Sequence, residues 1–171
     1  MKAVILAAGE GMRMRPLTDD KPKQLVEVAG KPILDYIFEA LPPEITEAIL
    51  VVGYRGDQIK AHYGDHFGKL RLTYETQEQP TGTMEAVRRA RPHLQEGERF
   101  MVMYADDIHG AAGIKACVES SGLAISVLAV EDPRRFGVVE TDEKGRVTEV
   151  VEKPEHPRSN LVSTGVFVLD T

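Results

Sequence analysis

Short apolar runs of strand length recur along the first 130 residues, and polar or glycine- and proline-containing segments separate them. The apolar runs predict strands at residues 3–6, 48–53, 70–76, 100–105 and 123–130, with a short extended piece at 24–28. The intervening segments predict helices near residues 32–41, 57–63, 84–90 and 113–119. Alternating strands and helices are typical of an α/β fold with a mostly parallel central sheet and helices on both faces.

The pattern changes after Pro133. Residues 136–141 and 146–151 have strand character and flank the sequence Asp-Glu-Lys-Gly, which predicts an antiparallel hairpin around a glycine-containing turn. A further strand is expected at residues 163–169. The sequence contains no internal repeat, low-complexity tract or linker, so a chain of 171 residues is expected to form a single domain.

Composition narrows the possible partners. The net charge of −6 disfavours a broad surface for nucleic acid or an anionic membrane, so an anion site has to be local. No apolar run approaches the ~20 residues of a membrane span, and Met1-Lys2 leads straight into a strand without a signal peptide. Cys117 is the only cysteine and is expected to be buried in a helix. A reducing, cytoplasmic location is therefore expected.

The segment Lys2–Lys23 has features that are typical of a phosphate-binding site. A buried strand is followed by the small residues Ala-Ala-Gly-Glu-Gly, and then by a loop with clustered cations. Such a turn lets backbone N–H groups point at an anion while nothing blocks its approach. The cations of the loop are Arg13, Arg15, Lys21 and Lys23, of which Arg15 and Lys21 are expected to face solvent.

Two common phosphate-binding motifs do not fit this loop. The dinucleotide fingerprint needs a third glycine where the chain has Met14, and the Walker A motif needs Gly-Lys-Ser/Thr, which Met14 also breaks. What remains is the pattern L-A-A-G-x-G-x-R-x-x-P-L-T followed by K-P-K. A tight turn with solvated charges is the alternative interpretation of the same residues.

Polar residues also follow two later strands. Gln77 and Gln79 come after the strand at 70–76, and Asp106 and Asp107 come directly after the strand at 100–105. An amide offers both a donor and an acceptor to a base edge, and Mg²⁺ commonly takes one or two protein carboxylates. Ligands gather at the carboxyl ends of parallel strands, so these residues are expected to share one site with the first loop.

These segments together resemble the sugar-1-phosphate nucleotidylyltransferases, or NDP-sugar pyrophosphorylases. The resemblance rests on the opening loop, the Q-x-x-x-x-G-T segment from Gln77, Ala105-Asp106, and later segments: F-G-V-V from Phe136, E-K-P from Glu152, and S-N-x-x-x-T-G from Ser159. It implies a Rossmann-like nucleotidyltransferase fold. Residues 1–130 would form the nucleotide-binding part and residues 131–171 an incomplete sugar-phosphate-binding part.

The resemblance also implies roles for individual residues. Arg13 and Lys23 would hold the triphosphate, Asp106 would bind Mg²⁺, and Gln77, in preference to Gln79, would recognise a pyrimidine base. The implied nucleotide-binding residues are Leu6, Ala7, Ala8, Gly9, Gly11, Arg13, Lys23, Gln77, Gly82 and Thr83. The loop after Gln77 is also expected to end in a helix cap at Thr81 or Thr83, which is compatible with this role.

The second half of the implied site would bind the sugar phosphate. Lys153 would pair with the 1-phosphate, Glu152 would accept from sugar hydroxyls, and the backbone near Gly137 and Gly165 would approach the ring. The implied sugar-phosphate-binding residues are Gly137, Glu152, Lys153, Asn160, Thr164 and Gly165. Without the resemblance, Glu152-Lys153-Pro154 would be interpreted as an exposed charge pair in a turn.

The implied reaction is transfer of a nucleoside monophosphate from an NTP, UTP or dTTP, to a sugar 1-phosphate such as glucose 1-phosphate, with Arg13, Lys23, Asp106 and Lys153 as catalytic residues. Two alternatives remain: a binding fragment without turnover, and a cytidylyltransferase for a non-sugar phosphate such as choline phosphate. The resemblance implies that family members continue past Thr171 and carry a second metal-binding Asp there, so a truncated chain is expected in preference to a reduced relative that completes its site in another way. The sequence is compatible with a homo-oligomer.

Overall fold

The computed structural model describes residues 1–79 and 82–171, which form a mixed α/β structure. The strands are β1 (Lys2–Ala7), β2 (Glu27–Val28), β3 (Lys31–Pro32), β4 (Glu47–Val52), β5 (His66–Phe67), β6 (Leu70–Thr76), β7 (Arg99–Tyr104), β8 (Ala124–Ala129), β9 (Gly137–Thr141), β10 (Val147–Glu152) and β11 (Leu161–Asp170). The α-helices are α1 (Ile33–Ala40), α2 (Gly56–Tyr63), α3 (Thr83–Arg89) and α4 (Ala111–Glu119). Short 3₁₀-helices are η1 (Met12–Met14), η2 (Lys23–Leu25), η3 (Arg91–His93) and η4 (Pro133–Arg135).

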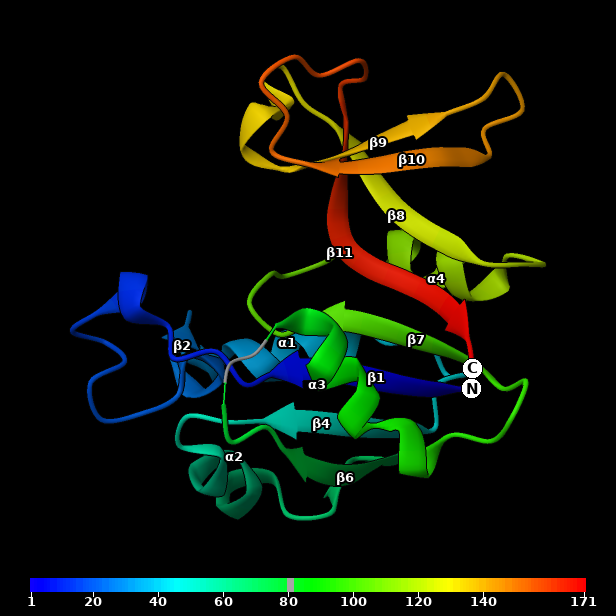
Figure 1. Cartoon of the computed structure of the whole chain (residues 1–171). Helices are drawn as coiled ribbons and strands as arrows, with labels where there is room; N and C mark the ends of the chain where they lie inside the picture. The colour runs from blue at the N-terminus through cyan, green and yellow to red at the C-terminus, as the bar shows by residue number, and fades with distance from the viewer. Residues whose placement is uncertain (80–81) are drawn as a thin grey trace.

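The centre of the main sheet is parallel. Strands β7, β1, β4 and β6 lie side by side in this order, with β1 paired in register to both β4 and β7. Their carboxyl ends therefore meet at one end of the sheet, whereas the two chain termini lie together at the opposite end (Figure 1). The predicted α/β fold with a parallel centre is confirmed.

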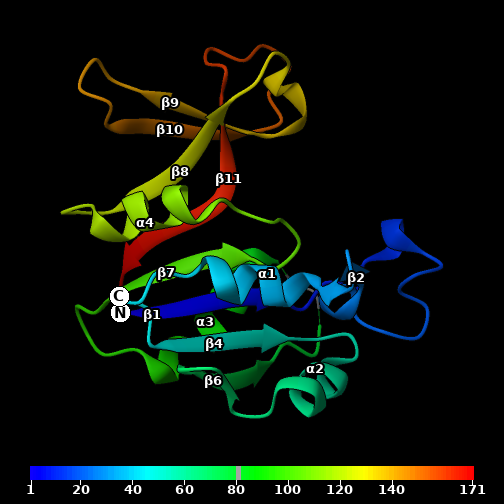
Figure 2. The same cartoon turned by 180° about the vertical axis from the view of Figure 1, so that it is seen from behind.

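The central strands are buried on both faces, as their continuous apolar runs require. Alternate residues of β1 point to opposite faces, so Ile5 packs in one cluster with Leu34 of α1 and Ile114 of α4, while Val4 packs in another with Ala86 of α3. The first cluster also holds side chains of α2 and the buried Cys117. Helices thus cover both faces of the sheet, as the alternation of elements predicts (Figure 2).

Antiparallel strands extend the sheet on the β7 side. β11 pairs antiparallel with β7, β8 and β9, and β9 pairs with β10 as the predicted hairpin. The hairpin stands at the far end of the molecule from β6, and β11 connects the two regions (Figure 1). Strand β8 completes the βα alternation in the sequence but is not part of the parallel centre, because it pairs only with β11.

Two local predictions differ from the structure. Residues 24–28 are not one extended piece, because the 3₁₀-helix η2 occupies Lys23–Leu25 and the extended part begins at Val26, before β2. Thr83 does not cap helix α3, because it is the first helical residue and Gly82 holds the N-cap position without a side-chain hydrogen bond. The other predicted cap, Thr81, lies outside the described residues. None of the helices formed by residues 1–79 and 82–171 is long and apolar enough to cross a membrane.

Candidate active site

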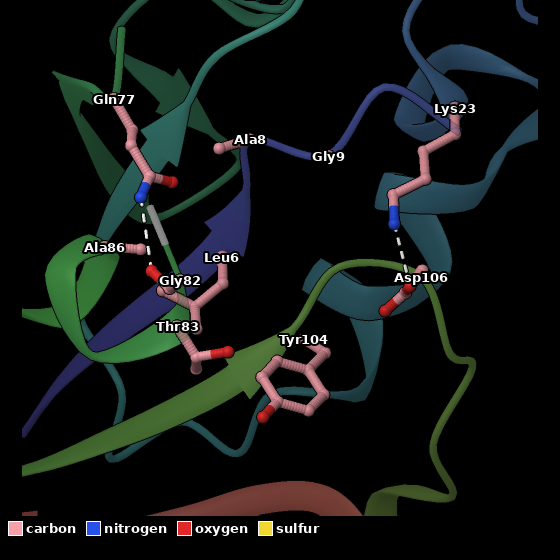
Figure 3. Close-up of a pocket in the computed structure, with 10 residues that line it drawn as sticks. All are labelled: Leu6, Ala8, Gly9, Lys23, Gln77, Gly82, Thr83, Ala86, Tyr104 and Asp106. Carbon is pink, nitrogen blue, oxygen red and sulfur yellow. Dashed lines mark hydrogen bonds and ion pairs between the residues drawn. The ribbon is translucent and has the colours of Figure 1, made fainter. Parts of the chain in front are cut away.

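A pocket of about 390 Å³ lies at the carboxyl ends of β1, β6 and β7 (Figure 3). It is lined by Leu6, Ala8, Gly9, Lys23, Gln77, Gly82, Thr83, Ala86, Tyr104 and Asp106. Segments from the first loop, the β6–α3 connection and the end of β7 thus meet in one place, as expected for the carboxyl edge of a parallel sheet. Among the residues expected from the sequence, Ala7 belongs to the buried core, and Gly11 and Arg13 are not part of this lining.

The first loop has a defined fold that brings Lys23 back to the strand end. Gly11 has φ +69°, in the left-handed region, and a Cβ there would lie 3.0 Å from Cβ of Lys23 and 3.1 Å from Cγ2 of Thr18. The buried hydroxyl of Thr18 donates to the carbonyl of Gly11 at 2.9 Å. Glycine is therefore needed here both for the backbone conformation and for the close packing.

The charged end of the pocket is formed by Lys23 and Asp106. Nζ of Lys23 lies 2.7 Å from Oδ2 of Asp106, although the residues are 83 positions apart in the sequence. The side chain of Lys23 is only 13% exposed, whereas that of Asp106 is 42% exposed. A Cβ on Gly9 would lie 3.4 Å from the same Nζ, so the ammonium group sits directly beside the small-residue turn (Figure 3).

Gln77 lies at the opposite end of the pocket and is almost fully buried. Its backbone N–H donates to the carbonyl of Val52 at the end of β4, at 2.8 Å. Its side-chain Nε2 donates to the carbonyl of Gly82 at 3.2 Å. Because a carbonyl can pair only with the amide nitrogen, the orientation of the side chain is determined, and its oxygen faces away from Gly82 toward Ala8 (Figure 3).

His109 follows the carboxylates of Asp106 and Asp107 on the loop before α4. Its Nε2 atom is buried, without a hydrogen-bond partner in the described part of the chain. Burial lowers the pKa of His109 because it disfavours the imidazolium ion, while Asp107 and Asp106 act in the opposite direction. The imidazole does not line the pocket, so it has no direct position in the candidate site.

Three residues near the pocket were not anticipated. Tyr104 and Ala86 line it, and Gln24 is fully buried and donates from Nε2 to the carbonyl of Ala7, at the end of β1, at 3.2 Å. Gln24 thereby ties the segment that carries Lys23 to the end of β1. Its Oε1 atom is buried without a partner among the described residues. A polar residue directly after Lys23 was the only available signal.

The residues expected to bind a sugar phosphate lie apart from this lining. Lys153 lines a separate depression of about 530 Å³ with Asp132, Arg134, Arg135, Pro154 and Glu155. Its ammonium is 3.0 Å from Oε1 of Glu152, and both side chains are exposed. The loop after β1 and the end of β10, which precedes Lys153, nevertheless lie on the same side of the molecule as the carboxyl ends of the parallel strands (Figures 1 and 2).

The backbone of Lys153 is unusual. Its φ of +46° lies in the left-handed region, which non-glycine residues seldom adopt. The position is held because its N–H donates to the carbonyl of Phe136 at 3.0 Å, beside the pairing of Glu152 with Gly137. Unfavourable backbone conformations of this kind persist only where the surroundings enforce them, and they cluster at functional sites.

The other expected sugar-phosphate residues are placed by β11 and the loop before it. Asn160 is exposed, and Thr164 donates to the carbonyl of Ser126 at 3.3 Å. Gly165 has φ +82°, and a Cβ there would lie 2.5 Å from Cδ2 of Tyr104. Gly165 thus lies against the ring of Tyr104, which lines the pocket.

A divalent cation would find few protein ligands here. Among residues 1–79 and 82–171, no three His, Cys, Asp or Glu side chains are grouped so that they could hold a metal ion. Asp106, with the exposed Asp107 beside it, is the available carboxylate at the pocket. One or two carboxylates suit Mg²⁺ where phosphate oxygens and water complete the coordination.

Comparison with known proteins places these observations in a family. The chain is 41% identical to the UTP–glucose-1-phosphate uridylyltransferase AglF of Haloferax volcanii, covering 98% of this chain and 71% of that protein. It is 40% identical to a glucose-1-phosphate thymidylyltransferase of Streptomyces antibioticus, covering 98% of this chain but 49% of that protein. With several other relatives, too, the chain spans only 40–49% of their length.

Solved structures show the same architecture. A putative glucose-1-phosphate thymidylyltransferase from Bacillus anthracis superposes with a TM-score of 0.79 at 26% identity, covering 99% of this chain and 71% of that one. A UDP-glucose pyrophosphorylase complexed with UDP-glucose superposes with a TM-score of 0.83 at 21% identity, covering 99% of this chain and 75% of that one, which supports the Rossmann-like fold alone. Residues 2–171 match the family described as nucleotidyl transferase. The chain belongs to the nucleotidyl transferase family.

Proposed function

We propose that this chain transfers a nucleoside monophosphate from UTP or dTTP to a sugar 1-phosphate, with glucose 1-phosphate as the favoured acceptor. The observation that carries the proposal is the arrangement of one pocket, with an amide for a base at one end and the Lys23–Asp106 pair for a triphosphate and its metal at the other. One relative is named as a UTP–glucose-1-phosphate uridylyltransferase and another as a glucose-1-phosphate thymidylyltransferase. These names support glucose 1-phosphate as the acceptor.

The orientation of Gln77 supports uracil or thymine as the base. One N–H of its amide nitrogen donates to Gly82, so the oxygen acceptor and the second N–H are the groups that it can offer to a ligand. Uracil and thymine carry an N3–H donor that can pair with this oxygen, whereas N3 of cytosine is an acceptor and would face another acceptor. A Gln77 oxygen aimed at N3 of the base would fit UTP and dTTP and would repel N3 of CTP, which weighs against the cytidylyltransferase alternative.

In the proposed reaction, an oxygen of the sugar phosphate attacks the α-phosphorus of the NTP in line. The bond from the α-phosphorus to the bridging oxygen of the β-phosphate breaks, and pyrophosphate leaves with that electron pair. No general base is needed, because the phosphate monoester is already ionised. Catalysis then depends on positioning and on stabilising the charge that develops around the α-phosphorus.

The chain's cations supply that stabilisation. Lys23 is at the pocket and pairs with phosphate oxygens of the NTP, while Arg13, on the same exposed loop, folds onto the triphosphate as a bidentate donor. Lys153 binds the sugar phosphate and holds it for attack. Asp106 would hold Mg²⁺, with Asp107 as its neighbour, and the ion when bound neutralises phosphate charge and orients the triphosphate.

Release of pyrophosphate tests the proposal directly. The chain is incubated with UTP, dTTP, CTP or GTP and Mg²⁺, with and without glucose 1-phosphate, and a parallel series replaces the sugar by choline phosphate. We expect release only with UTP or dTTP in the presence of glucose 1-phosphate. Nucleotide binding without release would instead support a binding module, and release only with CTP and choline phosphate would support a cytidylyltransferase.

A further inference from the structure

The Lys23–Asp106 ion pair spans the place where, under the proposed function, a triphosphate and a divalent cation have to bind. Its two charged groups are 2.7 Å apart, and the ammonium lies beside Gly9 in the turn expected to cradle phosphate. The two charged groups therefore neutralise each other in this structure. Neither can take its ligand without giving up this contact.

The charges make the two exchanges interdependent. A divalent cation approaching Asp106 meets the ammonium group of Lys23, and a metal-free triphosphate approaching Lys23 meets the carboxylate of Asp106. Both approaches are opposed by like charge at short range, in a pocket where Lys23 is largely shielded from water. When metal and triphosphate arrive together, Asp106 binds the cation and Lys23 binds phosphate, so both broken contacts are replaced.

We propose that the Lys23–Asp106 pair is a latch that couples metal binding to nucleotide binding. The latch weakens the binding of metal alone and of nucleotide alone, and it favours the binding of the metal–nucleotide complex. This inference rests on the proposed function, because it assumes that Lys23 and Asp106 are the groups that hold the triphosphate and the cation. By thermodynamic linkage, metal and nucleotide must raise each other's affinity by the same factor.

Binary binding measurements test the latch without turnover. Mn²⁺ is titrated into the nucleotide-free protein, and UTP is titrated in the presence of EDTA, both by isothermal calorimetry. We expect Lys23→Gln to bind Mn²⁺ alone at least about fivefold more tightly than the wild type, and Asp106→Asn to bind metal-free UTP at least about fivefold more tightly. Residues that acted only as independent ligands would give no gain in either case.

Two control variants separate the latch from general changes in charge. Lys21→Gln removes a cation of the same loop that does not line the pocket, and Asp20→Asn removes an exposed carboxylate of that loop that does not line it either. Both should leave the binary affinities within twofold of the wild type. The latch is overturned if Lys23→Gln binds Mn²⁺ no better than the wild type, or if Asp20→Asn strengthens UTP binding as much as Asp106→Asn does.

The two arms use different residues, so one remains informative if a variant does not fold, which thermal unfolding reports. The result also separates the latch from the proposed function. Wild-type protein that fails to bind UTP even with Mg²⁺ contradicts the proposed function. Wild-type protein that binds the UTP–Mg²⁺ complex, but whose Lys23→Gln variant gains no affinity for Mn²⁺, contradicts the latch alone.

Discussion

The amide nitrogen of Gln77 donates to the carbonyl oxygen of Gly82 across a loop that separates strand β6 from helix α3. This hydrogen bond closes the loop and orients the amide at the same time, so the base preference proposed here depends on a contact within the protein. The proposed base preference therefore needs both the N–H that Gln77 donates to Gly82 and the oxygen acceptor that it offers to the base.

Gln77→Glu tests this dependence, because it keeps the shape of the side chain but removes the donor. The new carboxylate would face the carbonyl of Gly82, and we expect kcat/KM with UTP to fall by about 10–100-fold, the effect of a lost buried hydrogen bond. The ratio of UTP to CTP turnover should change little, because the carboxylate oxygens also accept from N3–H of uracil and repel N3 of cytosine. Gln79→Glu, the same change in the same loop but outside the pocket lining, should keep both values near those of the wild type.

Lys23 and Lys153 are expected to be needed for turnover. Lys23→Ala and Lys153→Ala should each lower kcat/KM by at least ~10²-fold, because each removes a cation that stabilises charge in the transition state. Steady-state kinetics of pyrophosphate release measures the effect, with Lys21→Ala as the matched control for loss of a lysine. Near-normal turnover in both variants would refute the assignment of these residues.

The left-handed backbone of Lys153 predicts a difference in stability between its glycine and alanine variants. Glycine adopts φ > 0 without the steric cost that a side chain incurs there, roughly 1–2 kcal/mol. Lys153→Gly should therefore be at least as stable as Lys153→Ala, and more stable by about 1 kcal/mol in urea denaturation, although both lose activity. Equal or lower stability of the glycine variant would show that the left-handed conformation at position 153 does not destabilise the folded state.

The packing of β11 at Gly165 can be tested by comparison with Gly145, which lies outside this strand. Both have positive φ, of +82° and +74°, but a Cβ on Gly165 would meet the ring of Tyr104 whereas a Cβ on Gly145 would meet nothing within 4 Å. Gly145→Ala should cost about 1 kcal/mol from backbone conformation alone. Gly165→Ala should cost at least ~1 kcal/mol more, because the ring has to move.

The free energy of unfolding of both variants, measured in urea, checks this difference. A matching loss in the two variants would mean that the Tyr104 ring accommodates the added methyl group without strain. Binding of UTP with Mg²⁺ provides a second measurement, since displacement of Tyr104 alters the lining of the pocket only in the Gly165 variant.

Much of the fold could be predicted from the sequence because its central strands are buried on both faces. The apolar runs of β1, β4 and β7 are continuous, and the polar residues Gln77 and Asp106, which follow β6 and β7, lie at the edge where ligands of α/β sheets bind. The direction of β8 could not be predicted in this way. Its neighbours are determined by β11, which lies more than thirty residues later in the chain.

The candidate site was predictable only in part, for related reasons. Motif spacing identifies Lys23 and Asp106 separately, but their direct ion pair depends on how the first loop folds back through Gly11 and Thr18. Gln24 is polar and was expected in an extended segment, whereas it lies in the 3₁₀-helix η2 and is fully buried. The left-handed backbone of Lys153 is imposed by its contact with Phe136 and leaves no local sequence signal.

Strand β11 has a mechanical consequence for the two halves of the molecule. Its first residues pair with β8 and β9, its last residues pair with β7, and the register with β8 shifts between Ser163 and Phe167, around Gly165. A single bent strand therefore sets the spacing between the hairpin and the nucleotide pocket. Because Gly165 lies at this shift and against the ring of Tyr104, the course of β11 toward the hairpin is linked to a side chain that lines the pocket.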